Sequence, residues 1–132
     1  MKRKILIVED NVGLSQIQKD WLSRAGYDAV TAMSEPIARS LIRKTQFDLI
    51  LSDVRLPEGD GISLLEWLRK EKKDIPFIIT TEYVSVPDVV RTIKLGARDY
   101  LPKPVHREHL LELAEDVFHP VATVRKQERQ LF

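Results

Sequence analysis

The sequence predicts an α/β fold, a doubly wound five-stranded parallel sheet with helices on both faces. Short apolar runs alternate five times with stretches in which apolar residues recur at helical spacing. The apolar runs are continuous rather than alternating, which is typical of strands buried on both faces. The length of 132 residues fits one ordinary domain with a core of its own.

Three strands and two helices are predicted in the first half of the chain. A helix over residues 12–25 follows from the spacing of its apolar groups, and Gly26 acts as its stop. Ser34 is predicted to cap the second helix, whose first turn contains Pro36 and whose apolar face runs through residues 37–42. The predicted strands are residues 5–8, 27–33 and 47–51.

The second half continues the alternation. A loop rich in turn formers, residues 54–61, leads from the third strand into the next helix. The remaining strands are residues 77–81 and 99–101, and the remaining helices are residues 62–68, 87–95 and 110–118. Crossovers between parallel strands should be right-handed, and a doubly wound sheet has its functional crevice outside the carboxyl ends of its strands.

Composition excludes several classes of protein. Without cysteine, the chain has no disulfides, thiolate metal sites or cysteine nucleophiles. Its formal charge of +1 is too balanced to favour nucleic-acid or membrane binding, and we expect neither. No apolar run approaches the roughly 18 residues that span a bilayer, and the amino terminus does not resemble a signal peptide. We therefore expect a cytoplasmic protein.

Chemically reactive side chains follow four of the five predicted strands. Glu9 and Asp10 come after the first strand, Asp53 ends the third, Thr81 ends the fourth and Lys103 follows the fifth. Each alone has an ordinary explanation, such as a solvated turn, a helix cap or a surface lysine. Because all of them fall at carboxyl ends of strands, we expect them to meet in one pocket.

The chemistry of this pocket follows from the residue types. Crowded carboxylates repel one another unless a cation lies among them, and an all-oxygen site with few protein ligands suits Mg²⁺. Asp53 stands alone at a strand end and is the candidate nucleophile, which would form an aspartyl phosphate. Glu9 and Asp10 are better placed to hold the ion, and Asp10 is the stronger candidate because it lies nearer the strand tip. An ammonium would offset charge on the phosphoryl oxygens.

Five sequence blocks resemble the receiver domains of bacterial two-component response regulators. They are residues 5–11, 48–57, 60–61, 76–81 and 95–104, and the similarity covers about residues 3–118. The resemblance implies a flavodoxin-like sheet with strand order 2-1-3-4-5. We accordingly expect a receiver domain over residues 1–119 and a tail, or the start of a linker, over residues 120–132.

The resemblance also implies a role for each matching residue. Asp53 would accept a phosphoryl group from a histidine kinase. Glu9, Asp10, Asp53 and the backbone carbonyl of Arg55 would bind Mg²⁺, which is the expected cofactor. The domain would then act as a phosphorylation-dependent switch that controls a partner or an effector.

The phosphoryl group and the output surface involve further residues. Thr81 and Lys103 would contact the phosphoryl oxygens, and the Lys103–Pro104 bond would be cis. Tyr100 would swing inward when Thr81 moves, although its position is also that of an ordinary half-buried strand aromatic. Residues 87–118 would form the surface used for a homodimer or for docking another domain. Residues 53–57 and 94–97 are similar to receivers that precede ATP-dependent transcriptional activators, so a transcriptional effector could follow residue 132.

One position departs from the family pattern. The residue after the family threonine is usually small, whereas here it is Glu82. Either Glu82 points to solvent or pairs with Arg55, or phosphorylation is impaired and the domain works as a constitutive docking module. We favour the first alternative, and we expect Arg55, Glu82 and Tyr83 to modulate the lifetime of the phosphoryl group.

Other classes of function predict different features. A receiver-fold docking module that works without phosphorylation would not bind Mg²⁺. A phosphatase with an aspartyl-phosphate intermediate usually needs a second acid soon after the nucleophile, and residues 54–57 contain none. A nucleotide- or flavin-binding protein would need a glycine-rich phosphate loop, whereas residues 9–13 begin with two acids. We therefore expect no enzyme activity beyond the domain's own phosphorylation and dephosphorylation.

Overall fold

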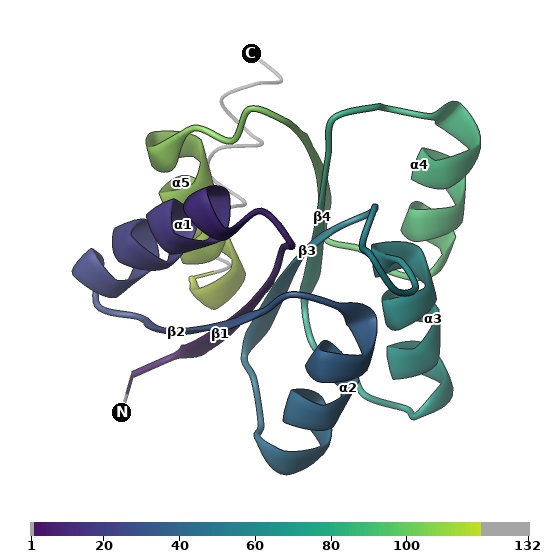
Figure 1. The fold of residues 1–132 in the computed structure, drawn as a ribbon, viewed down its shortest axis with the longest axis horizontal. Coiled ribbons are helices and arrows are strands. Elements are labelled where there is room, and N and C mark those ends of the chain that lie inside the picture. The colour runs from purple at the N-terminus through teal and green to yellow at the C-terminus, as the bar shows by residue number, and fades with distance from the viewer. Residues whose placement is uncertain (1, 120–132) are drawn as a thin grey trace.

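The computed structural model describes residues 2–119, in which five strands and five helices alternate along the chain (Figure 1). The strands are β1 (Lys4–Val8), β2 (Asp28–Ala32), β3 (Leu49–Asp53), β4 (Phe77–Thr81) and β5 (Asp99–Pro102). The helices are α1 (Val12–Arg24), α2 (Glu35–Lys44), α3 (Gly61–Lys70), α4 (Val86–Lys94) and α5 (Arg107–Phe118). The predicted alternation is therefore confirmed.

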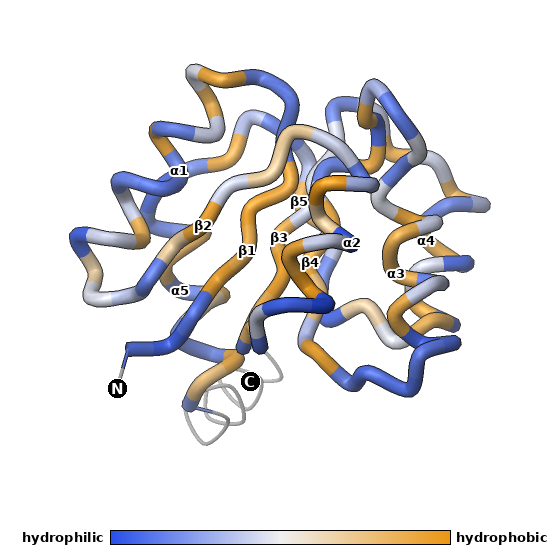
Figure 2. Tube along the Cα trace, turned by 60° about the horizontal axis from the view of Figure 1, so that its bottom comes forward, coloured by the Kyte–Doolittle hydropathy of each residue, from blue (hydrophilic) through white to orange (hydrophobic). Residues whose placement is uncertain are grey.

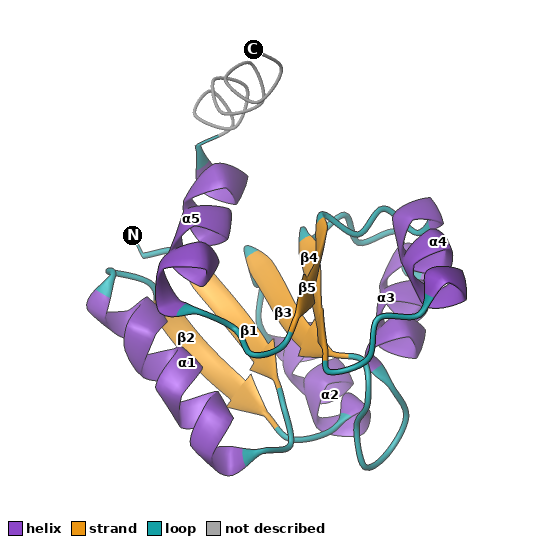
Figure 3. Cartoon of the chain, turned by 90° about the horizontal axis from the view of Figure 1, so that it is seen from above, coloured by secondary structure: helices purple, strands orange, loops and turns teal. Residues whose placement is uncertain are grey.

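The five strands form one parallel sheet in the order β2-β1-β3-β4-β5. Helices α1 and α5 cover one face, and α2, α3 and α4 cover the other (Figure 1, Figure 3). The chain leaves β1 toward β2 and later returns to the opposite side of β1 with β3. Such a reversal opens a crevice between the carboxyl ends of two adjacent strands, here β1 and β3.

The core consists of two apolar layers, one on each face of the sheet. Successive strand residues point to opposite faces, so a strand covered on both sides must be apolar throughout. Figure 2 shows the strands as the hydrophobic centre of the molecule. One layer includes Leu6, Val8, Ile50, Phe77 and Ile79, and the other includes Ile5, Ile7, Leu49, Leu51 and Ile78. Among residues 2–119, no helix combines the length with the apolar character that a bilayer-spanning segment needs.

The strand and helix ends differ from the predicted ones by a few residues. The second strand is shorter than predicted because its pairing with β1 begins at Asp28 and ends at Ala32. The third strand begins at Leu49, since Phe47 buries its ring without joining the ladder. The last helix begins at Arg107, a turn before the first apolar residue of the predicted pattern, because its first turn is polar and exposed.

Helix caps leave Asp53 free for another role. The hydroxyl of Ser34 accepts the Ile37 N–H at 3.4 Å, which confirms the predicted cap of α2. Helix α3 is capped by Asp60, whose Oδ1 accepts the Ser63 N–H at 2.7 Å. Asp53 therefore does not cap the helix that follows it, and its carboxylate stays at the end of β3.

Candidate functional site

Four strands deliver the candidate residues to one end of the sheet. Val8 is paired with Ser52 across β1 and β3, so Glu9 and Asp53 are the next residues on adjacent strands. Lys103 directly follows β5, and its backbone N–H donates to the carbonyl of Thr81 at 2.7 Å. Parallel pairing thus brings residues from distant parts of the chain to the same crevice, as predicted.

The acidic residues form one cluster. Glu9, Asp10 and Asp53 each offer a carboxylate oxygen, and these three oxygens lie within 4.8 Å of one another. Glu9 and Asp53 are buried, whereas Asp10 is exposed and leaves one side of the cluster open to water. Oxygen ligands with an open side fit Mg²⁺, which prefers carboxylates and keeps several of its waters.

Lys103 supplies the positive charge beside this cluster. Its ammonium donates to Glu9 Oε1 at 2.6 Å and to Asp53 Oδ2 at 2.9 Å, and its side chain is only 9% exposed. The Lys103–Pro104 peptide bond is cis, as predicted. The ammonium therefore neutralises part of the charge on the nucleophile candidate and on a neighbouring acid.

The pKa values of Glu9 and Lys103 follow from burial and hydrogen bonding. Burial raises the pKa of Glu9 above its ordinary value and outweighs the opposing hydrogen bond from Lys103. Burial alone would lower the pKa of Lys103, but its hydrogen bonds to Glu9 and Asp53 outweigh that effect and raise it. Lys103 therefore stays cationic at neutral pH.

The two acids after β1 are held differently. Glu9 accepts the Asn11 N–H through Oε2 at 3.1 Å in addition to its bond with Lys103. Asp10 makes no ion pair within residues 2–119 and faces solvent. The exposed Asp10 is therefore free to approach a cation directly, whereas Glu9 is fixed by the protein.

The loop after β3 contacts both Asp53 and the loop after β4. The backbone N–H of Arg55 donates to Asp53 Oδ1 at 3.3 Å. The Arg55 guanidinium lies over the Tyr83 ring, 4.7 Å from its centroid. Glu82 is exposed, and no ion pair joins it to Arg55 in the described part of the chain. Of the two alternatives for Glu82, the structure shows exposure to solvent, and the Arg55 side chain contacts Tyr83 instead of Glu82.

Thr81 and Tyr100 lie beyond the acidic cluster. The Thr81 hydroxyl donates to the Tyr83 carbonyl at 2.9 Å and accepts the Tyr83 N–H at 3.1 Å, so it engages the β4–α4 loop. The Tyr100 ring is partly buried against the core layer on the α2–α4 face. Its hydroxyl is near Thr81 and Ser85 without a hydrogen bond of normal geometry, and burial raises its pKa.

One residue near the site was missed from sequence. It is Glu35, whose buried side chain accepts the Asp60 N–H at 2.9 Å. That contact joins α2 to the loop after Asp53 across 25 residues of sequence. A contact of this kind has no local sequence pattern by which it could be predicted.

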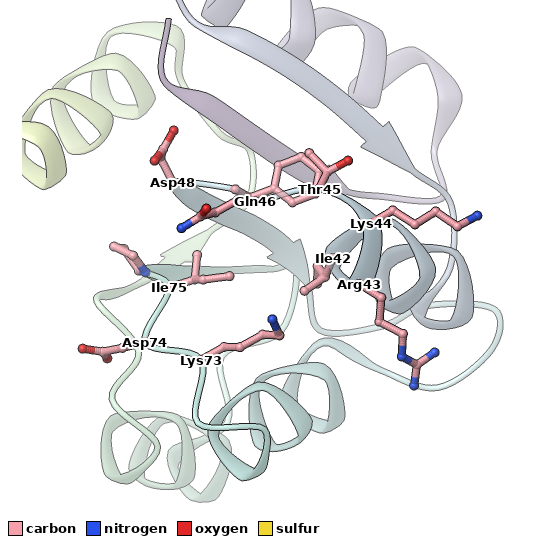
Figure 4. A pocket seen from close by; sticks show the side chains of 11 residues that line it. Ile42, Arg43, Lys44, Thr45, Gln46, Asp48, Lys73, Asp74 and Ile75 are labelled. Carbon is pink, nitrogen blue, oxygen red and sulfur yellow. The ribbon is translucent and has the colours of Figure 1, made fainter. Parts of the chain in front are cut away.

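A hollow of about 620 Å³ lies at the opposite edge of the sheet, far from the acidic cluster. It is lined by the end of α2 and the segments that precede β3 and β4 (Figure 4). In Figure 4, Lys73 extends toward Ile42, whereas Lys44 and Asp74 point away. The hollow contains none of the predicted site residues.

The sheet order, the acidic cluster and the lysine at the strand ends define a receiver-type α/β domain. The chain belongs to the response regulator receiver domain family, which matches residues 5–115. It is therefore a receiver domain of two-component signalling.

Curated relatives are longer proteins of the same family. The response regulator protein PilR of Pseudomonas aeruginosa is 34% identical over 112 residues, which are 85% of this chain and 25% of PilR. The transcriptional regulatory protein ZraR of Salmonella typhimurium is 39% identical over 114 residues, 86% of this chain and 26% of ZraR. The chain thus spans about a quarter of the length of these relatives.

Solved structures confirm the fold. The non-phosphorylated HemR receiver domain from Leptospira biflexa has a TM-score of 0.83 at 36% identity, covering 89% of this chain and 95% of that domain. A CheY-like receiver domain protein from Methanospirillum hungatei has a TM-score of 0.85 at 29% identity, with coverages of 98% and 99%. The predicted flavodoxin-like topology is therefore correct.

Proposed function

We propose that this domain is a phosphorylation-dependent switch that accepts a phosphoryl group on Asp53 from a histidine kinase. The observation that supports it most strongly is the convergence of three carboxylates and one ammonium at Asp53. In this proposal Glu9, Asp10, Asp53 and the Arg55 carbonyl hold Mg²⁺. When bound, the ion would offset charge on the phosphoryl oxygens.

The transfer uses the chain's own groups in defined roles. A carboxylate oxygen of Asp53 attacks phosphorus, and the bond from phosphorus to the donor imidazole breaks, with its electron pair left on the nitrogen. Lys103 donates to Asp53 Oδ2 at 2.9 Å and is positioned to bond a phosphoryl oxygen after transfer. The Arg55 N–H fixes the other oxygen of Asp53, which orients the nucleophile.

Switching would begin at Thr81. To donate to a phosphoryl oxygen, its hydroxyl must give up the hydrogen bond that it donates to the Tyr83 carbonyl. Tyr100, whose hydroxyl is near Thr81, would follow this movement. A change from mostly inactive to mostly active requires that phosphorylation favour the active state by about 5 kcal/mol.

The output surface is proposed to be residues 87–118, used for a homodimer or an effector. Helix α4 suits a moving part because Thr92 is its only buried residue. Apolar side chains on and before this helix are exposed, among them Val84, Val86, Val90 and Ile93. PilR and ZraR are longer than this chain, which supports an effector beyond residue 132. The proposed tail, residues 120–132, lies outside the described residues.

Phosphoryl uptake tests the assignment. Purified domain is incubated with acetyl phosphate and Mg²⁺, and intact mass spectrometry measures the added phosphoryl group. Wild type should be labelled, Asp53→Asn should not, and Asp74→Asn, at the other edge of the sheet, should behave as wild type. Label on Asp53→Asn would refute the phosphoacceptor assignment. A wild type that takes no label from a donor or a kinase would favour the docking module.

We further propose that Arg55, Glu82 and Tyr83 modulate the lifetime of the phosphoryl group. The Arg55–Tyr83 contact joins the two loops that flank Asp53, so it restricts the approach of water. Tyr83→Ala should shorten the half-life of the phosphorylated domain by about two- to tenfold, a range set by a cation–π contact worth about 0.5–1 kcal/mol plus the lost shielding. Asp74→Asn, which changes an exposed charge at the other edge of the sheet, serves as the comparison.

A further inference from the structure

Glu35 is a buried carboxylate that phosphoryl transfer itself does not use. It is the first residue of α2, and its side chain is only 6% exposed. Oε1 accepts the Asp60 N–H at 2.9 Å, and Oε2 pairs with Arg39. Burying a carboxylate is costly unless its oxygens are bonded. The bonds to Asp60 and Arg39 are therefore needed to offset the cost of burying the Glu35 carboxylate.

The loop backbone lies directly on this side chain. Gly59 has a φ of +78°, and a Cβ at this position would lie 2.9 Å from the Cβ of Glu35 and closer still to its carboxylate. A side chain at position 59 would push Glu35 away from the loop. The absence of a side chain at Gly59 therefore allows Glu35 to pack against the loop backbone, and this contact is separate from the hydrogen bond to Asp60.

Backbone contacts connect the Glu35 side chain to Asp53, the proposed nucleophile. Asp60 forms an antiparallel bridge with Arg55, and the Arg55 N–H donates to Asp53 Oδ1 at 3.3 Å. The Gly61 N–H also donates to the carbonyl of Val54 at 2.8 Å. Residues 54–60 thus form a loop held by its own backbone contacts. The hydrogen bond from Asp60 to Glu35 connects this loop to α2.

Arg39 in turn fixes the carboxylate of Glu35. Its guanidinium pairs with Glu35 and lies over the ring of Trp67 in α3, 5.1 Å from the centroid. The carboxylate is therefore fixed between the helices on either side of the loop. A group so held can set the position of the loop backbone rather than follow it.

We propose that Glu35 is a positioning residue that presets the loop after β3 for cation binding, through Asp60 and Arg55. The proposal rests on the proposed function, because it assigns the Arg55 carbonyl to the cation. Residues that orient metal ligands without touching the metal typically change its affinity by 10–100-fold when removed. Glu35 does not touch the reacting atoms, so its effect is on affinity and loop order.

The test measures Mg²⁺ binding by calorimetry with magnesium chloride alone, and amide hydrogen exchange of the loop without the metal. Glu35→Ala should weaken Mg²⁺ binding about tenfold and speed exchange over residues 54–60. Glu35→Gln keeps an acceptor for the Asp60 N–H and should bind within about threefold of wild type. Asp48→Ala is the control, since Asp48 accepts the Lys4 N–H at 2.8 Å at the other edge. It should lower the melting temperature without changing Mg²⁺ affinity.

A second pair of variants tests the contact between Glu35 and the loop by changing the loop residue, Gly59. Gly59→Ala should weaken Mg²⁺ binding, whereas Gly26→Ala should only destabilise, because Gly26 has a φ of +97° with nothing within 4 Å of an added Cβ. This pair decides the question if Glu35→Ala fails to fold. Unchanged affinity and unchanged loop exchange in Glu35→Ala or Gly59→Ala would overturn the inference. If wild type binds no Mg²⁺, the proposed function fails, and loop exchange alone then decides whether Glu35 positions the loop.

Discussion

Replacing Asp10 by asparagine should stabilise the metal-free domain and weaken its binding of Mg²⁺. Asp10 shares a space 4.8 Å across with the carboxylates of Glu9 and Asp53. Unlike these two acids, it is not bonded to Lys103. Its charge therefore repels its neighbours without a direct partner, and a neutral amide of the same shape removes that repulsion.

The spacing sets the size of the effect. Two unit charges 4.8 Å apart repel by about 3.5 kcal/mol at an effective dielectric constant of 20, and by about 1 kcal/mol in water. Because Asp10 is exposed, the lower limit is nearer the truth, and attraction to Lys103 offsets part of it. The net gain should be about 0.5–1 kcal/mol, which corresponds to a rise of about 2–6 °C in melting temperature.

Thermal and urea unfolding, followed by circular dichroism with EDTA or with Mg²⁺, measures both effects. Mg²⁺ at 100 times its dissociation constant should stabilise wild type by about 2.7 kcal/mol and Asp10→Asn by much less. Asp74→Asn, which removes an exposed charge before β4, is the control and should change neither quantity much. A metal-free Asp10→Asn domain that is less stable than wild type would refute the electrostatic argument.

Three further predictions concern parts of the fold outside the site. Gln18 is 1% exposed and its amide nitrogen has no hydrogen-bond partner in the described chain, so Gln18→Leu should raise the unfolding free energy by about 1–3 kcal/mol. The exposed Gln16→Leu in the same helix should change it by less than about 0.5 kcal/mol, and equal effects in urea unfolding would contradict this explanation. Burial raises the pKa of Tyr27, so the neutral phenol stabilises the fold below the unfolded pKa of about 10, and this contribution is lost as pH rises through the folded pKa. Alkaline absorbance titration should show two late-ionising tyrosines, Tyr27 and Tyr100, and Tyr27→Phe should remove one of them. Arg69 donates to four backbone carbonyls, two in the segment after α3 and two directly after α4. Arg69→Met should therefore lower the free energy of unfolding in urea by about 2–3 kcal/mol. The control Lys70→Met, at an exposed position, should lower it by less than about 0.5 kcal/mol.

Local sequence patterns were sufficient for the elements and for the end of the sheet that carries the site. Apolar runs and helical spacing are properties of short segments, so strands and helices could be predicted within a few residues. Parallel pairing places every strand's carboxyl end at one edge of the sheet, so the sequence by itself predicts that Asp10, Asp53 and Lys103 lie together, as they do. The cap at Ser34 is local in the same sense.

Only the tertiary structure decided how the side chains are partnered. Glu9 is buried and bonded to Lys103, 94 residues away, although both it and Asp10 follow the same strand. Arg55 lies over Tyr83 instead of pairing with Glu82, and Glu35 supports a loop 25 residues further on. Side-chain direction and burial depend on which distant segments pack together, and no periodicity within one segment contains that information.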